Sequence, residues 1–159
     1  MGKVLSAFSN GFAGAIARSI DDVVISLGSK ADDPIPFGAA VALSDDKTGV
    51  VPFDPATHTG ADFLGISVRN PSKTPDTYGA SVGSYAPNDP VDVLVRGHIV
   101  IKLSGTAALG AQVGIRKDQG TFVPFSDADT QVALPNVRVS GVPDSSRMTE
   151  VVLTNRNLL

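Results

Sequence analysis

The residues best suited to covalent chemistry lie in segment 79–83, which reads Gly-Ala-Ser-Val-Gly. This spacing matches G-x-S-x-G, a pattern in which a sharp strand-to-helix turn exposes a nucleophilic serine, here Ser81. The context that the pattern requires is missing, because residues 84–90 contain two prolines and cannot begin the helix. A histidine follows at His98, but nothing in the sequence pairs it with Ser81. We therefore expect no enzymatic activity and assign no catalytic residue.

The histidines and aspartates form no recognisable metal-binding pattern. His58 and His98 are the two histidines of the chain, and neither has a second histidine or a glutamate at helical ligand spacing. Asp127-Ala128-Asp129 resembles the beginning of a calcium loop, but the third acidic residue, the glycine and the terminal glutamate are absent. The chain has no cysteine, so disulfides, thiolate ligands and thiol catalysis are excluded. We expect no metal and no cofactor.

The composition is typical of a β-rich domain and argues against several classes of partner. Of the 16 acidic residues only Glu150 is a glutamate, and glycine and proline together number 27 of 159 residues. Aspartate, glycine and proline favour turns, whereas the scarce glutamate favours helices. The net charge of −3 and the lack of a basic cluster argue against nucleic-acid binding. No segment is apolar for long enough to suggest membrane insertion.

Segment 91–103 gives the clearest prediction of secondary structure. Its odd-numbered residues are apolar apart from Gly97, and its even-numbered residues are mostly polar. This alternation predicts a half-buried β-strand with the odd row in the core and His98 in the outward row. Because most strands have only about five or six residues, we expect a bend, and Gly97 lies at the midpoint. The predicted fold is all-β, a single β-barrel or jelly-roll-like sandwich.

Shorter strands with turns between them are expected through the rest of the chain, which is consistent with one domain. Phe37 and Val41 share a face of one such strand, and residues 117–120 read as a hairpin turn. The remaining candidates are residues 37–43, 50–51, 63–69, 81–85, 111–115, 121–123, 137–142 and 151–154.

Residues 1–33 are expected to form an N-terminal arm, with the β domain in residues 34–159. The arm carries Phe8, Phe12, Ile16 and Ile20 at four-residue intervals, which indicates a short helix that nearby glycines weaken. Such an arm either orders against another molecule or covers one end of the barrel. We take these four apolar residues as the candidate partner contacts.

Several local motifs together resemble the structural cement (decoration) proteins of tailed bacteriophages. The resemblance covers most of residues 8–155 and rests on apolar alternation and glycine positions, not on catalytic residues. The motifs are residues 11–14 (Gly-Phe-Ala-Gly), 34–41 (Pro-Ile-Pro-Phe-Gly-Ala-Ala-Val), 63–69 (Phe-Leu-Gly-Ile-Ser-Val-Arg), Tyr85, 89–97 (Asp-Pro-Val-Asp-Val-Leu-Val-Arg-Gly) and 109–113 (Leu-Gly-Ala-Gln-Val).

The resemblance implies a non-enzymatic protein made in the bacterial cytoplasm that sits on the outer surface of the virion head. It would bind the major capsid protein and clamp adjacent capsomers against the pressure of packaged DNA. We expect a homo-oligomer, a homodimer in preference to a homotrimer. The alternative is a tail or fibre module that binds a host surface glycan, with Tyr78 and Tyr85 of the 70–90 loop lining the site. A hydrolase using Ser81 is the third hypothesis.

Overall fold

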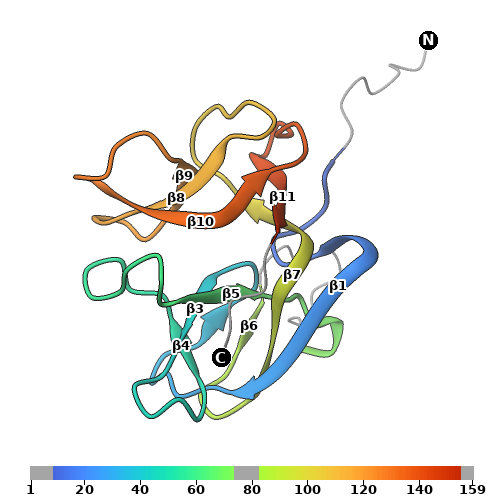
Figure 1. The fold of residues 1–159 in the computed structure, drawn as a ribbon. Helices are drawn as coiled ribbons and strands as arrows, with labels where there is room; N and C mark the ends of the chain where they lie inside the picture. The colour runs from blue at the N-terminus through green and yellow to red at the C-terminus, as the bar shows by residue number, and fades with distance from the viewer. Residues whose placement is uncertain (1–8, 74–82, 155–159) are drawn as a thin grey trace.

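The computed structural model describes residues 9–73 and 83–154, and every regular element in these residues is a β-strand, with one exception (Figure 1). One 3-10 turn, Pro71–Lys73, is the exception. This confirms the all-β prediction, and the main sheet curls strongly, as expected for a barrel-like or sandwich fold. The strands are β1 (Ile16–Gly28), β2 (Ile35–Pro36), β3 (Ala40–Leu43), β4 (Val50–Pro52), β5 (Phe63–Ser67), β6 (Ser84–Tyr85), β7 (Pro90–Lys102), β8 (Gln112–Arg116), β9 (Phe122–Pro124), β10 (Gln131–Val139) and β11 (Met148–Leu153).

The long strand β7 connects the two halves of the main sheet. The sheet has nine strands in the order β4-β3-β5-β7-β11-β10-β8-β9, and β1 pairs separately with β7. The first half of β7 lies beside β5, and its second half lies beside β11. In Figure 1, β8, β9 and β10 accordingly form the upper half of the molecule, while β3, β4 and β5 lie below. A separate two-stranded sheet joins β2 to β6.

The predicted bend of the central strand is confirmed at Gly97. This residue has φ +120°, a conformation that side chains with a Cβ rarely adopt. A Cβ built there would press on Oδ1 of Asp22, whose Cα is 3.0 Å away. The register of β1 against β7 shifts around the same point, between Arg18 and Val23. Gly97 therefore allows β7 to bend and allows β1 to pack closely against it.

The single buried row predicted for residues 91–103 is wrong in one respect, because the row divides between two cores. Val91, Val93 and Val95 pack in the lower core, together with Ile35 and Tyr85. The odd residues after the bend, Ile99, Ile101 and Leu103, belong to a second core together with Leu94 from the even row. This second core takes residues from both halves of the sheet, β3 and β5 as well as β8, β10 and β11. The irregular backbone at Gly97 moves the face of the strand from one core to the other.

Most of the shorter predicted strands are confirmed, with shifted ends. The strand expected at residues 37–43 begins only at Ala40, although Phe37 and Val41 do share the lower core. The hairpin at residues 117–120 joins β8 to β9 as expected. All five residues of β5 are buried, and only the last, Ser67, has a polar side chain, as expected for a strand covered on both faces.

Among the described residues, no helix is long and apolar enough to cross a membrane.

The short helix indicated near the N-terminus is wrong for the residues that the structure describes. Ile16 and Ile20 lie in strand β1, which is rich in β-branched residues and is hydrogen bonded to β7. Gly11 and Gly14 have φ of +100° and +79°, which interrupt any helix before it. The division of the chain into an arm (1–33) and a body (34–159) stays a prediction.

Candidate interaction surface

The N-terminal segment 9–15 is fastened to the body by the side chain and backbone of Asn10. The Asn10 amide nitrogen Nδ2 donates to the carbonyl oxygens of Val142 and Met148, each at 2.7 Å. The Asn10 backbone N–H donates to Oδ2 of Asp144 at 2.9 Å. Burial opposes the charge of Asp144, but hydrogen bonds from the backbone N–H groups of Asn10, Met148 and Ser146 outweigh it and lower the pKa of this carboxyl. Asn10 thus ties the segment to the loop between β10 and β11.

The backbone of Gly14 attaches segment 9–15 to the body at a second point. The Gly14 N–H donates to the carbonyl oxygen of Val100 at 2.8 Å, and the Gly14 carbonyl accepts from the Arg69 N–H at 2.7 Å. A Cβ on Gly14 would lie 2.8 Å from the backbone nitrogen of Gly38. Only glycine permits this approach, so the segment lies directly on the backbone of the body.

Phe12 lies in the chain between the attachment points Asn10 and Gly14, and its aromatic ring is partly open to solvent. The Arg69 guanidinium carbon is 4.6 Å from the centre of the Phe12 ring and 5.8 Å from the centre of the Phe37 ring. Cation–π geometry of this kind orients an aromatic side chain without burying it. Phe12 keeps 40% of its surface exposed, and Ile16, at the start of β1, keeps 39%.

We call Asn10, Phe12, Ile16 and Val142 the N-terminal face. Val142 is 71% exposed, and its carbonyl oxygen is bound by Asn10, so its loop adjoins the segment. Figure 1 shows this segment passing beside β11 before it enters β1. Exposed apolar residues gathered in this way are typical of binding surfaces.

The four predicted contact residues have different outcomes in the structure. Phe12 and Ile16 are described and partly exposed, as a contact residue must be. Phe8 lies outside the described residues, and Ile20 is described only as backbone in β1. Their role as partner contacts stays a prediction. Sequence reasoning missed Asn10 and Val142, because a pattern of apolar spacing cannot reveal a loop more than a hundred residues away.

A groove of about 390 Å³ opens beside the docked segment at Ala13. Phe37 and Phe122 contribute rings to its wall, and Lys102 is its charged residue. The groove therefore adds a concave, largely apolar surface next to the N-terminal face.

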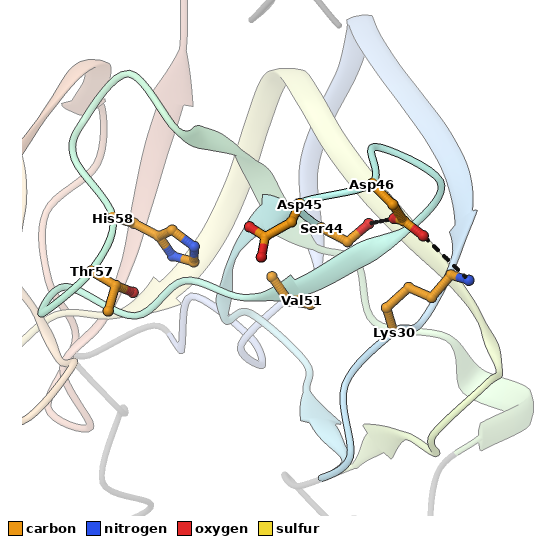
Figure 2. Close-up of a pocket in the computed structure, with 7 residues that line it drawn as sticks. All are labelled: Lys30, Ser44, Asp45, Asp46, Val51, Thr57 and His58. Atoms are coloured by element: carbon orange, nitrogen blue, oxygen red, sulfur yellow. Dashed lines mark hydrogen bonds and ion pairs between the residues drawn. The ribbon is translucent and has the colours of Figure 1, made fainter.

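A larger polar hollow of about 610 Å³ lies around the β3–β4 turn (Figure 2). Lys30, Asp46 and His58 line it, but they do not form a catalytic set. Nδ1 of His58 accepts a hydrogen bond from the backbone N–H of Asp54 at 2.9 Å, which closes a turn. The ring of His58 also rests 5.3 Å from that of Phe53, centre to centre. We assign His58 a structural role in this turn.

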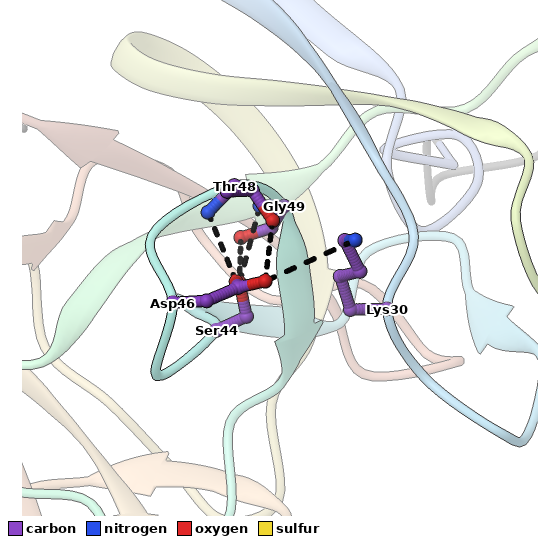
Figure 3. Close-up of polar contacts among 5 residues, drawn as sticks. All are labelled: Lys30, Ser44, Asp46, Thr48 and Gly49. Carbon is purple, nitrogen blue, oxygen red and sulfur yellow. Dashed lines mark hydrogen bonds and ion pairs between the residues drawn. The ribbon is translucent and has the colours of Figure 1, made fainter.

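Asp46 is occupied by hydrogen bonds within its own turn (Figure 3). Its carboxylate accepts from the Ser44 hydroxyl at 2.6 Å and from the Thr48 hydroxyl at 2.7 Å. These bonds, with the Thr48 N–H, hold the pKa of Asp46 far below its usual range. Lys30 Nζ lies 3.9 Å from the same carboxylate. A carboxylate that stays ionised in this way closes a turn and is unsuited to general acid or base catalysis.

The other candidate chemical residues also have structural partners. Asp127 accepts from the Asp129 N–H at 2.9 Å and from the Thr130 hydroxyl at 3.0 Å. The Lys117 ammonium donates to the carbonyl oxygens of residues 128 and 129, so a positively charged group already lies at this loop. No group of three or more potential metal ligands occurs within residues 9–73 and 83–154. Ser81 lies outside the described residues.

Tyr85, considered above as part of a glycan site, lies in the lower core. Its side chain is fully buried, and its hydroxyl donates to the carbonyl oxygen of Val68 at 2.6 Å. Its ring packs edge-on against Phe37 with 5.2 Å between ring centres. Burial raises the pKa of Tyr85 to about 12. A sugar could not stack on this ring without opening the core.

Comparison with known proteins identifies the family. The family model described as "Structural cement protein (E217 gp24/Pam3 gp6)" matches residues 3–154 of this chain. The chain belongs to this family of phage structural cement proteins. It is therefore a structural protein of the bacteriophage capsid, as the sequence motifs indicated. No curated protein matches the cement protein.

A solved phage capsid structure contains a chain with a similar fold. The chain is similar to one in "The capsid of Myoviridae Phage XM1", with a TM-score of 0.73 and 14% identity over 97% of this chain and 96% of that one. At this identity the likeness concerns the fold alone. The head fibre base gp8.5 of bacteriophage phi29 matches with a TM-score of 0.44 and 14% identity, over 86% of this chain and 99% of that one. That score is too low to carry an argument.

Proposed function

We propose that this cement protein binds the outer surface of a phage head and clamps adjacent capsomers, which stabilises the shell against the pressure of packaged DNA. The family match over residues 3–154 carries this proposal. The partner is the major capsid protein, and the protein acts by binding, without catalysis.

The architecture supports a clamp with two parts. The curled sheet is a rigid body, because long-range strand pairing through β7 ties its two halves together. The N-terminal face is fixed to this body by Asn10 and Gly14, so Phe12 and Ile16 are held in position on it. A preorganised apolar contact loses less conformational entropy on binding than a free arm does.

Many copies on one shell make modest individual affinities sufficient. Neighbouring contacts on a continuous lattice act at high effective concentration, so the shell is stabilised cooperatively. A polar rim around exposed aromatic residues is a usual composition for such a contact. The exposed side chains of Phe12 and Ile16 have charged groups near them: Arg69 lies over the Phe12 ring, and Arg18, two residues after Ile16, is ion-paired with Glu150 at 2.8 Å.

Binding of purified protein to heads that lack it tests the proposal. We expect Phe12→Ala, and deletion of residues 2–8, each to weaken co-sedimentation with the heads by roughly 10-fold or more, the loss typical of an aromatic contact. Leu109→Ala is the matched control, because Leu109 is a more exposed apolar residue (64%) in the turn before β8. Loss of binding by the control alone, or by none of the variants, would contradict the assignment of the N-terminal face.

A further inference from the structure

Strand β1 presents an open backbone edge at the border of the main sheet. Among the described strands it pairs with β7 alone, and Figure 1 shows it along the outer side of the molecule. The two strands that end the sheet path, β4 and β9, have three residues each, whereas β1 has 13. Short edge strands offer little to a second chain, but a long one is a template for pairing.

Hydrogen bonding defines which part of this edge is open. The Ser29 N–H bonds to the carbonyl oxygen of Asp89, and residues 24–28 keep the same register against β7, so Ile25 and Leu27 also direct their N–H groups toward β7. Ser26, which faces Asp92, therefore directs its N–H group outward. Beyond residue 28 the edge is covered, because Lys30 donates its N–H to Val50 at 2.9 Å. The open stretch is thus residues 23–27, about the length of an average strand.

The chemistry of this stretch also favours pairing. It reads Val-Val-Ile-Ser-Leu, without charge and without proline. Such segments have high β-propensity and aggregate when their edge stays exposed. The outward side chain of Val24 is 40% exposed, and no charged residue interrupts the run.

We propose that this edge is a homotypic interface, in which residues 23–27 of two copies pair antiparallel across a two-fold axis. One such contact pairs the open edges of both copies and closes the assembly as a dimer. If the edge paired with a different surface of the second copy, the edge of that second copy would stay unpaired. The charges at the two ends favour the antiparallel direction. Asp21 and Asp22 precede the stretch and Lys30 follows it. Within the chain, Asp21 is paired with Arg96 at 2.6 Å and Lys30 lies 3.9 Å from Asp46. Antiparallel copies bring the acidic end of one stretch toward Lys30 of the other, whereas parallel copies would bring the two acidic ends together. The interface does not depend on capsid binding.

Proline at an outward position tests the interface with little cost to the body. Ser26→Pro removes one outward N–H, and proline is tolerated at an edge strand. Ser26→Ala is the control, because it keeps that N–H while losing the hydroxyl that binds Asp92. By sedimentation equilibrium of the full chain, we expect the control to remain a dimer. Ser26→Pro should raise the dimer dissociation constant roughly 10-fold or more, since each copy loses a ladder bond. A monomeric parent chain, or dimers of equal strength in both variants, would overturn the proposal.

Hydrogen exchange of the unmodified chain provides a second test that does not depend on the folding of any variant. We expect the amides of Val24 and Ser26 to exchange slowly at high protein concentration and faster on dilution below the dissociation constant. The amide of Ser29 is bonded within the chain and should exchange at the same rate at both concentrations. Fast, concentration-independent exchange at Val24 and Ser26 would overturn the proposal. So would slow exchange that dilution leaves unchanged, because another segment of the same chain would then cover the edge.

Discussion

Replacing Gly97 by alanine should destabilise the protein more than replacing another glycine of similar backbone conformation. A non-glycine residue in an unfavourable positive-φ conformation costs about 1–3 kcal/mol. At Gly97 the added Cβ also presses on Asp22, whose Cα is 3.0 Å away, and overpacking of this kind costs about 1–3 kcal/mol more. We therefore expect Gly97→Ala to lower the free energy of unfolding by about 2–6 kcal/mol, the sum of the two effects.

Gly105→Ala is the matched control for the dihedral cost. Gly105 has φ +111°, but the nearest atom to its added Cβ is Cδ of Pro124 at 3.3 Å. Urea unfolding should place the Gly97→Ala midpoint below that of Gly105→Ala at an equal slope, with a difference of about 1–3 kcal/mol. Equal destabilisation by the two substitutions would refute the close approach of β1 to β7.

Asp22→Ala then isolates the steric part of the effect. Asp22 Oδ1 accepts only a long bond of 3.3 Å from the His98 N–H, and its Oδ2 is buried without a hydrogen-bond partner within the described structure. Asp22→Ala alone should therefore change stability little. In the double variant with Gly97→Ala, we expect the combined loss to be smaller than the sum of the single losses by about 1 kcal/mol or more. Strict additivity would contradict the assigned contact.

Two further predictions concern the docked segment and the lower core. Asn10→Ala removes the two side-chain bonds to residues 142 and 148. The amide of Gly14 should then exchange with solvent roughly 10-fold faster or more, since each bond contributes about 1 kcal/mol, and an unchanged rate would show that the segment is held elsewhere. For Tyr85, the raised pKa means that the buried neutral phenol stabilises the fold fully below pH 10, with that stability lost as pH rises toward 12. In a Tyr78→Phe variant, ultraviolet titration should show the remaining tyrosine ionising near pH 12, and a midpoint near 10 would contradict its burial.

The fold class was predictable because strand periodicity dominates this sequence. Segment 91–103 shows the alternation clearly, and Gly97 at its midpoint marks the bend. The division of its odd row between two cores could not be seen, since a bulge leaves the alternating pattern unchanged while it rotates the strand. The beginning of β1 was mistaken for a helix because residues four apart lie on one face of a strand as well as on one side of a helix.

The candidate site was predictable only in part. Apolar spacing pointed to Phe12 and Ile16, which are partly exposed. The contacts that fix them, Asn10 with the loop at Val142 and Phe12 with Arg69, join residues distant in the chain and leave no local pattern. Tyr85 shows the converse difficulty, because a tyrosine in a polar loop looks exposed in sequence but lies in the core.

The most direct test of a role as capsid cement is the copy number of this protein in purified particles of its parent phage, measured by quantitative mass spectrometry against the major capsid protein. A binding role across the whole shell predicts a ratio near one to one, or a simple fraction of it. A handful of copies per particle, or none, would contradict it.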